Sequence, residues 1–291
     1  MKEKMVKYDN KMNEICFRKF SQTDLNAFMK IVIEICEKGV QEIEIDFDEI
    51  MIDIDYKGKK SEFVTALLTF CEKVMALRVR DDDGEPMVIS LFSRFKPIKS
   101  RKVLQICVNK DNEFYFNNLG KAFTSYGFRE FISLESKYSK NLFRLLMQWK
   151  SKGHCPTEYT DNYFTIIEIK DFLDTPDYEP KRLREFIIEP AIKELNESGL
   201  FQNLELVVHK AKKRGSPVMG YSFRFEPVQT KKNLSEKQKK AIEHKEIGDY
   251  VPAKELEKQK KSKQNRFNDF PQREYTNEQM SDLEKRLLGR T

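Results

Sequence analysis

Hydrophobic positions along the chain recur with two periods, one typical of helices and one typical of strands. From Ser133 to Gly153, and again from Pro180 to Asn196, they recur every three or four residues, as on one face of an amphipathic helix. From Leu200 to Lys210 and from Val218 to Phe225 they alternate with polar residues, as in the two strands of a hairpin. A short β-rich segment and a short helix separate the two long helices. This order of elements predicts a winged helix-turn-helix.

The first half of the chain repeats this order. Ser21 to Gly39 and Lys59 to Leu77 are predicted as its long helices, with a strand at Glu42 to Asp46 between them. The sheet of this half is predicted to be completed by the segments Leu77–Val79, Pro86–Phe95 and Val103–Val108. An internal duplication explains this repetition better than one large domain. The predicted fold class is therefore α+β, with two tandem winged helix-turn-helix domains.

Changes in composition suggest where the domains begin and end. We predict a first domain over residues 1–131, a second over 132–228, and a charged, largely flexible tail over 229–291. The first domain would open with a loose polar arm at residues 1–11 and close with a packed helical bridge over the aromatic-rich residues 112–131. Residues 229–263 are rich in Lys, Glu and Gln and carry too few apolar residues for a core.

The end of the tail regains apolar residues. A small apolar motif after a charged tether is typical of a peptide that docks onto a partner, although a frayed terminal helix gives the same pattern. The candidate docking residues are Phe267, Phe270, Leu283 and Leu287.

Composition narrows the classes of function. The net charge of +6, with 34% charged residues, favours a polyanionic partner. No segment has the pattern of a signal peptide or the length of a membrane span, so we expect a cytoplasmic protein without a membrane partner. The five cysteines form no C-x-x-C pair and the three histidines lie far apart, which argues against disulfides, zinc and any other cofactor.

Basic residues mark the second domain as the main candidate for DNA binding. The helix that begins at Lys181 has the position of a helix that enters the major groove, and the hairpin tip can reach adjacent phosphates. A winged helix used for protein contacts, with these residues as a solvated face, remains the alternative. The candidate DNA-binding residues are Lys181, Arg182, Arg184, Lys210, Lys212, Lys213 and Arg214.

The first domain differs in charge. Its hairpin turn is predicted at Asp81–Asp83, in the place of Lys212–Arg214, and three carboxylates repel a phosphate backbone. A pairing or regulatory role therefore suits this domain better than sequence reading. Another set of basic residues lies nearby and provides secondary DNA-binding candidates: Lys59, Lys60, Arg94, Lys96, Lys99, Arg101 and Lys102.

The sequence gives little support for an enzyme. It has no His-x-His pair for a rolling-circle nuclease, and Gly58-Lys59-Lys60-Ser61 lacks the upstream glycine of a phosphate-binding loop. Four carboxylates offer a weaker alternative, a two-magnesium site with primase-like chemistry. These are Asp46, Asp48, Asp53 and Asp55. Because acidic turns are commoner than metal sites, we expect no enzymatic activity.

Two sequence motifs resemble a known family. Tyr138-Ser139-Lys140 in the first helix of the second domain, and the run from Glu189 to Glu194 in its last helix, are similar to the plasmid replication initiators with two tandem winged-helix domains. The resemblance extends over roughly residues 8–227, and residues 265–272 are weakly similar to tails of Gram-positive members. Within the last helix, Pro190 matches the family, and its position in a helix interior suggests a bend.

The resemblance implies a function. Such proteins bind direct repeats in double-stranded DNA at a plasmid origin, chiefly as monomers, help to open the duplex, and recruit the host initiator and replicative helicase. As dimers joined through the first domain they often bind an inverted repeat and repress their own gene. It also implies that base reading belongs to Lys181, Arg182 and Arg184, and phosphate contact to Lys210, Lys212, Lys213 and Arg214. Two other functions stay open, a chromosomal transcription regulator of the same fold and a protein-docking scaffold.

Overall fold

The structure, a computed structural model, describes residues 3–80, 85–117, 122–156, 163–212 and 215–227. Residues 228–291 lie outside the described part, and with them the predicted tether and its docking residues Phe267, Phe270, Leu283 and Leu287. Among the described residues, no helix combines the length and the apolar character that crossing a membrane requires.

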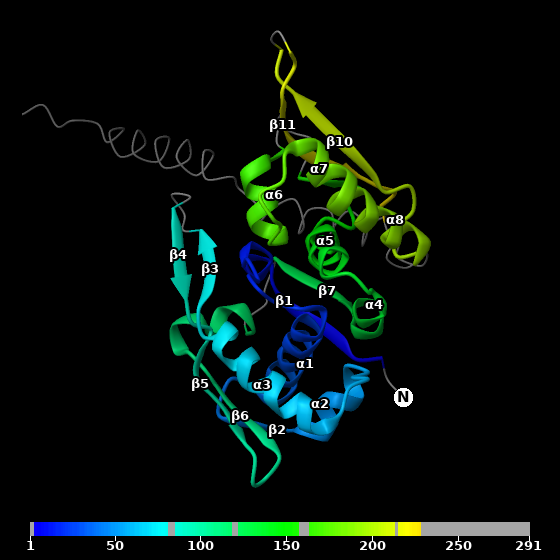
Figure 1. The fold of residues 1–291 in the computed structure, drawn as a ribbon. Helices are drawn as coiled ribbons and strands as arrows, with labels where there is room; N and C mark the ends of the chain where they lie inside the picture. The colour runs from blue at the N-terminus through cyan, green and yellow to red at the C-terminus, as the bar shows by residue number, and fades with distance from the viewer. Residues whose placement is uncertain (1–2, 81–84, 118–121, 157–162, 213–214, 228–291) are drawn as a thin grey trace, which may run out of the picture. The chain divides into compact units, whose positions relative to one another are not determined.

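The first winged helix packs its helices against an antiparallel sheet in which β6 lies between β2 and β5 (Figure 1). The elements of this unit are α1 (Gln22–Lys38), β2 (Ile43–Asp46), α2 (Phe47–Asp53), α3 (Lys60–Val74), β5 (Phe92–Ile98) and β6 (Val103–Val108). They follow the predicted order of helix, strand, helix, helix and hairpin. Helix α1 begins with a capping box between Ser21 and Asp24 and ends at Gly39, whose φ of 95° favours glycine.

Aromatic rings fill the core of this domain. The ring centroid of Phe17 lies 5.0 Å from that of Phe20 and 4.7 Å from that of Phe28, and Phe70 of α3 lies 5.8 Å from Phe20. All four side chains are buried. This cluster joins α1 to α3 and fixes the helix pair from which the rest of the domain is positioned.

The segment Pro86–Phe95, predicted as one strand, is two strands in two different sheets. Within the part of the chain that the structure describes, strand β4 (Pro86–Ile89) pairs only with β3 (Leu77–Arg80), whereas β5 joins the sheet of β2 and β6. The break falls at Ser90, whose hydroxyl donates to the Phe92 carbonyl and whose own carbonyl accepts hydrogen bonds from the side-chain amides of Asn109 and Asn112. These local hydrogen bonds replace the sheet ladder at this point. Strands β3 and β4 are therefore an inserted hairpin outside the winged-helix sheet.

Two other predictions for the first domain are wrong. The N-terminal arm is not loose, because β1 (Met5–Asp9) pairs antiparallel with β7 (Phe123–Gly127). The aromatic bridge is therefore not helical throughout, since β7 lies between the 3-10 helix η2 (Lys110–Tyr115) and α4 (Phe128–Ser133). The physical reason is burial: Val6, Tyr8 and Tyr126 point alternately into the core and are at most 1% exposed.

The second winged helix has the predicted order of elements. These are α5 (Lys137–Gln148), β8 (His154–Cys155), β9 (Phe164–Thr165), α6 (Ile166–Leu173), α7 (Pro180–Leu183), the π-helix η3 (Arg184–Ile188), α8 (Glu189–Glu197), β10 (Glu205–Lys210) and β11 (Val218–Arg224). Strand β11 pairs with β10, β8 and β9, so the short strand before α6 closes the sheet as a winged helix requires.

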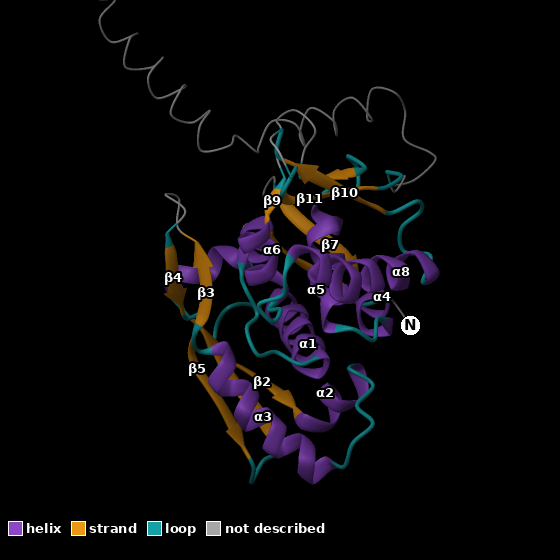
Figure 2. Cartoon of the chain, turned by 45° about the horizontal axis from the view of Figure 1, so that its top comes forward, coloured by secondary structure: helices purple, strands orange, loops and turns teal. Residues whose placement is uncertain are grey.

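Helix α5 joins the two winged helices. Figures 1 and 2 show it between α1 and β7 on one side and α6 and α8 on the other. Its Arg144 is fully buried and donates to the carbonyls of Met12 and Ile15, at 2.8 and 2.5 Å, in and just after the 3-10 helix η1 (Asn10–Glu14). The guanidinium also lies over the rings of Phe17 and Phe172, which come from different domains. A single side chain therefore ties the first domain to the second.

Candidate nucleic-acid interface

The candidate recognition helix is the continuous run α7–η3–α8. It begins with Pro180 at the first helical position, where the missing N–H costs nothing. Leu183, Ile187 and Leu195 bury its inner face. Figure 1 shows the run next to α6, in the place of the second helix of a helix-turn-helix.

Pro190 changes the helix in a definite way. It has no N–H to offer the carbonyl four residues earlier, that of Phe186, and its ring would collide with that carbonyl in a regular α-helix. The chain forms a π turn over Arg184–Ile188 instead, in which the N–H of Glu189 donates to the carbonyl of Arg184. The predicted disturbance at Pro190 is therefore a π turn placed just before it.

The two motifs that carry the family resemblance contact each other. The Glu194 carboxylate accepts hydrogen bonds from the backbone N–H groups of Glu135 and Ser136 and from the hydroxyl of Ser139. Because Ser139 lies in the first turn of α5 and Glu194 near the end of α8, this contact fixes the angle between the central helix and the recognition helix.

The predicted base-reading residues differ in their exposure to solvent and in their ion pairs. Lys181 and Arg182 are exposed at the start of the helix, and Lys181 is 4.0 Å from Glu185. Arg184 is only partly exposed and its guanidinium lies 3.1 Å from the carboxylate of Glu189 and 3.7 Å from that of Glu185. Arg184 is therefore held along the helix, while Arg182 points into solvent.

Charge divides this helix into two halves. The first half, Pro180–Ile188, holds three basic side chains and one acidic one, whereas the second, Glu189–Glu197, holds three acidic side chains and one basic one. Beside the second half, an open hollow of about 560 Å³ between α8 and β10 is lined by Glu189, Glu197 and Glu205 as well as Lys193. A phosphate backbone is attracted to the first half and repelled by the second.

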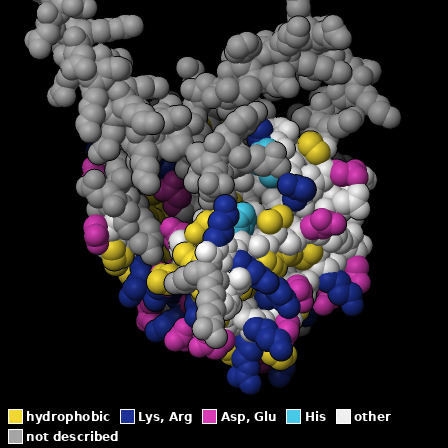
Figure 3. Space-filling view, turned by 90° about the horizontal axis from the view of Figure 1, so that it is seen from above, with side chains coloured by type: hydrophobic (Ala, Val, Ile, Leu, Met, Phe, Trp, Pro, Cys, Tyr) yellow, Lys and Arg dark blue, Asp and Glu magenta, His cyan; other side chains and the backbone are white. Residues whose placement is uncertain are grey.

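The β10–β11 hairpin forms the wing. Lys210 ends β10 and Lys212 follows in the turn, and both are exposed. Lys213 and Arg214 lie outside the described residues. The turn closes through a hydrogen bond from the Ala211 N–H to the Pro217 carbonyl. Figure 3 looks onto the end of the molecule that carries this hairpin in Figure 1 and shows basic side chains next to hydrophobic ones, with acidic side chains scattered around them.

The predicted match between the Asp81–Asp83 turn and the basic wing tip is wrong. In the second domain, the strand before the helix pair joins the sheet of the wing, since β9 pairs with β11. In the first domain the corresponding strand, β2, pairs with β6 of the β5–β6 hairpin and not with β3 or β4. The first wing is therefore β5–β6, and its turn holds Lys99, Arg101 and Lys102. Asp81–Asp83 belong to the inserted hairpin and lie outside the described residues.

The secondary candidates of the first domain fall into two groups. The arginines are paired on the outer face of the sheet, Arg94 with Glu42 and Arg101 with both oxygens of Glu44. The lysines Lys96, Lys99 and Lys102 are exposed and have no ion pair within the described residues. All three lysines belong to the first wing, Lys96 on β5 and Lys99 and Lys102 in its turn.

Lys59 and Lys60 come from outside this hairpin. Both are exposed at the start of α3, where Lys59 is the N-cap, and the ammonium of Lys60 is paired with the Asp48 carboxylate of α2. Their position matches the start of the helix that corresponds to α7–η3–α8. Lys60 is already neutralised there, which leaves Lys59 as the available cation of the two.

The carboxylates proposed as a weak magnesium site are already engaged by the protein. Asp46 caps α2 through the N–H groups of Asp48 and Glu49, and Asp55 pairs with Lys57. Asp53 pairs with Lys4 and Lys30. These contacts have structural roles and do not converge on a shared site.

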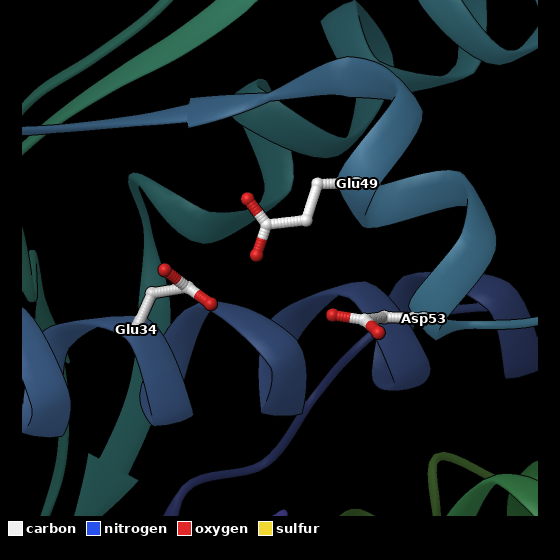
Figure 4. Close-up of side chains that lie close together, drawn as sticks. All are labelled: Glu34, Glu49 and Asp53. Carbon is white, nitrogen blue, oxygen red and sulfur yellow. The ribbon is translucent and has the colours of Figure 1, made fainter. Parts of the chain in front are cut away.

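A different acidic cluster, Glu34, Glu49 and Asp53, does converge (Figure 4). Its centre is taken by the fully buried ammonium of Lys30, which contacts all three carboxylates. Burial by itself would lower the pKa of Lys30, but hydrogen bonds to Asp53, Glu34 and Glu49 outweigh it and raise that pKa above its usual value. The cluster is a charge-satisfied core group in which an ammonium stands where a metal would.

Sequence reasoning missed two features of this region. Arg144 and Lys140 have the spacing of a solvent-facing row on α5, yet both are fully buried, because the first domain covers that row. Phe186, one of the hydrophobic residues that recur along Pro180–Asn196 and were expected to share one helix face, is 63% exposed. The π turn rotates this part of the helix. In the sequence, the sign of this turn is Pro190, four residues after Phe186.

Comparisons with known proteins agree with this geometry. A family model described as "Initiator Replication protein, WH1" matches residues 5–147, and one described as "Initiator Rep protein, WH2" matches residues 165–225. A curated protein of Bifidobacterium longum (strain NCC 2705), "Probable replication protein rep", is 25% identical over 228 residues, which are 77% of this chain and 73% of that protein. The crystal structure of Pi initiator protein in complex with iteron DNA matches with a TM-score of 0.56 at 13% identity, over 78% of this chain and all of that one.

Proposed function

The chain belongs to the family of replication initiators with two winged-helix domains, and from that premise we propose that it is a plasmid replication initiator that binds repeated DNA at its origin. The observation that carries the proposal is the second winged helix, whose recognition helix is basic at the end that would enter a major groove. The Pi initiator of similar fold is described in complex with iteron DNA, which supports the same class of ligand here.

The proposed division of labour follows the exposure of the basic residues. Lys181 and Arg182 read base edges, because they are exposed at the N-terminal end of the recognition helix. Arg184, paired along the helix, supports their position or contacts a nearby phosphate. The wing residues Lys210, Lys212, Lys213 and Arg214 contact phosphates and set the register on the duplex.

We further propose that the first wing contacts DNA. Its exposed lysines Lys96, Lys99 and Lys102 lie on the hairpin equivalent to the basic wing of the second domain. The acidic residues Asp81–Asp83, which would repel a phosphate backbone, fall between β3 and β4 in the sequence and not in this wing. Lys59 is proposed as a further phosphate contact. Arg94 and Arg101 instead pair with Glu42 and Glu44 on the sheet.

Self-association is proposed to use the inserted hairpin. Strand β4 pairs only with β3 among the described residues, so its outer edge offers free backbone groups, and Met87 and Val88 on it are exposed. Such an edge suits pairing with a second copy of the chain. A dimer joined in this way would bind an inverted repeat and repress the chain's own gene, whereas the monomer binds direct repeats.

Duplex opening and recruitment of the host initiator and helicase complete the proposal. The residues offered for docking are Phe267, Phe270, Leu283 and Leu287 of the tail, on the grounds of sequence pattern alone. The protein would act without enzymatic activity or a cofactor, by holding the origin and assembling other proteins on it.

Gel-shift titration of the full chain on the DNA that flanks its own gene tests this function, with random duplex as competitor. We expect a ladder of complexes on a directly repeated segment, one step for each repeat. Binding only to an inverted repeat would instead indicate a chromosomal transcription regulator. The absence of any preference over random duplex would contradict sequence-specific binding and favour a docking scaffold.

A further inference from the structure

An exposed phenyl ring lies in the middle of the recognition helix. Phe186 is 63% exposed, although Leu183, three residues before it, and Ile187, directly after it, are buried. It follows Arg182 by four residues, so the two side chains lie on the same outward row. An apolar ring in this position gains almost nothing from folding, because its area stays in water.

The backbone that carries this ring is fixed. Phe186 is the middle residue of the π turn, which the hydrogen bond from the Glu189 N–H to the Arg184 carbonyl closes. Buried Leu183, Ile187 and Ile188 anchor the opposite side of the helix. The ring of Tyr178 lies 6.5 Å from that of Phe186, centroid to centroid, and supports one of its flanks. The ring is therefore presented outward by a rigid scaffold and does not belong to a mobile loop.

The charges around the ring indicate what it faces. Phe186 lies in the basic first half of the helix, beside Lys181 and Arg182, and the acidic residues of the second half begin at Glu189. Glu185 and Glu189 are both within ion-pair distance of Arg184, which offsets their charge next to the ring. A surface that is apolar at its centre and basic on the side of Lys181 and Arg182 complements a major groove, in which phosphates flank the base edges.

The major groove offers one apolar group to such a ring, the 5-methyl group of thymine. We propose that Phe186 contacts the methyl group of a thymine in the recognised repeat and so contributes to base selectivity. This inference rests on the proposed function, because it requires the recognition helix to enter the groove. It adds a hydrophobic contact to the charged ones at Lys181 and Arg182.

Deoxyuridine provides the test, since it differs from thymine only by the missing methyl group. Each thymine of the bound repeat is replaced in turn by deoxyuridine, and the Kd of each duplex is measured for the wild-type chain and for Phe186→Ala. We expect one or two positions at which wild-type binding weakens about four-fold, the value of one buried methyl group. At those positions Phe186→Ala should bind the thymine and deoxyuridine duplexes equally.

Phe123→Ala is the matched control, because it removes a ring that is also exposed but lies on β7 of the first domain. It should keep the wild-type penalty at every position. Specific binding with no deoxyuridine penalty, or a penalty that Phe186→Ala retains, would overturn the thymine contact and leave the initiator function standing. DNA binding unchanged by Phe186→Ala would assign the ring to a protein partner. Loss of all preference for the repeat in the wild-type chain would overturn both proposals.

Discussion

At the scale of single residues, Arg144 shows how a buried charge can join two domains. Its guanidinium donates to the Asn141 side chain and to the carbonyls of Met12 and Ile15. Phe17 and Phe172 cover it. Burial lowers the pKa of Arg144, but each of its donor nitrogens has an acceptor. The residue is thus satisfied only when both domains are in place.

Arg144→Met should destabilise the chain more than an ordinary surface change. It leaves the Ile15 carbonyl buried without a donor, whereas the Met12 carbonyl keeps the hydrogen bond from the Ile15 N–H. Because one such buried group costs about 1–3 kcal/mol, we expect a loss of roughly that size in the free energy of unfolding. Urea denaturation followed by circular dichroism measures this. The control Arg129→Met changes an exposed arginine and should stay within about 0.5 kcal/mol of wild type. Equal midpoints for the two variants would contradict the bridging role.

The burial of Lys140 predicts that the free energy of unfolding depends on pH. Burial lowers the pKa of its fully covered ammonium to about 7, against a smaller opposing effect of Glu194. The unfolded chain holds this proton up to a pH of about 10. Between these values the unfolded state binds more protons than the folded state, so stability rises with pH. Below pH 7, Lys140 is protonated in both the folded and the unfolded state, so its contribution to the free energy of unfolding no longer changes with pH.

We therefore expect the free energy of unfolding of the wild-type chain, minus that of Lys140→Met, to increase from pH 7 to pH 10. The subtraction removes the titration of all other groups. Urea midpoints at three pH values across this window measure the difference. Parallel curves for the two proteins would show that Lys140 is charged in the folded state throughout.

At the scale of elements, the two wings are the most informative comparison. If each tip contacts phosphates, Lys212→Ala with Lys213→Ala and Arg214→Ala should lower the salt dependence of repeat binding, by about 0.9 in log–log slope for each lost phosphate contact. Lys96→Ala with Lys99→Ala and Lys102→Ala should do the same through the first wing. Neutralising the inserted hairpin with Asp81→Asn, Asp82→Asn and Asp83→Asn should leave the slope unchanged. A slope that responds to the aspartates and not to the lysines would reverse our assignment of the first wing.

The elements also show how far a sequence predicts this fold. Strong local patterns succeeded: the start of α1 at Ser21, its exit at Gly39 and strand β11 lie where they were predicted, and β10 covers the second half of the predicted segment Leu200–Lys210. Pairings between distant segments failed. Strand β1 has only five residues, too short a run for the alternation of Val6 and Tyr8 with Lys7 to stand out, and its partner is more than a hundred residues away. The break at Ser90 depends on side chains of Asn109 and Asn112, which no local pattern reveals.

The candidate site was predicted in part. Periodicity correctly placed Lys181 and Arg182 on the exposed surface of the recognition helix, and alternation placed Lys212 in the wing turn. It could not reveal that the π turn exposes Phe186, nor that Arg184 is held by acidic neighbours on its own helix. Assigning the first wing required the pairing of β2 with β6, which is a property of the folded sheet.

At the scale of the whole molecule, the buried helix α5 makes the described parts of the two winged helices one packed body. Besides Arg144, the side-chain amide of Asn13 donates to Gln148, and the ammonium of Lys140 donates to the carbonyl of Phe131. If both wings contact DNA as we propose, two units held in this way would read a repeat in a fixed register. Such coupling suits a protein that must bind several repeats in succession along an origin.

We propose that this chain starts replication at repeated DNA. The most direct measurement uses a plasmid that carries the repeat-containing fragment and a selectable marker but no initiator gene, with the chain supplied from a second plasmid. We predict that the test plasmid is maintained with the wild-type chain and lost with Arg182→Ala at equal protein level. Maintenance of the test plasmid without the chain, or its loss despite wild-type protein bound to the repeats, would contradict this function.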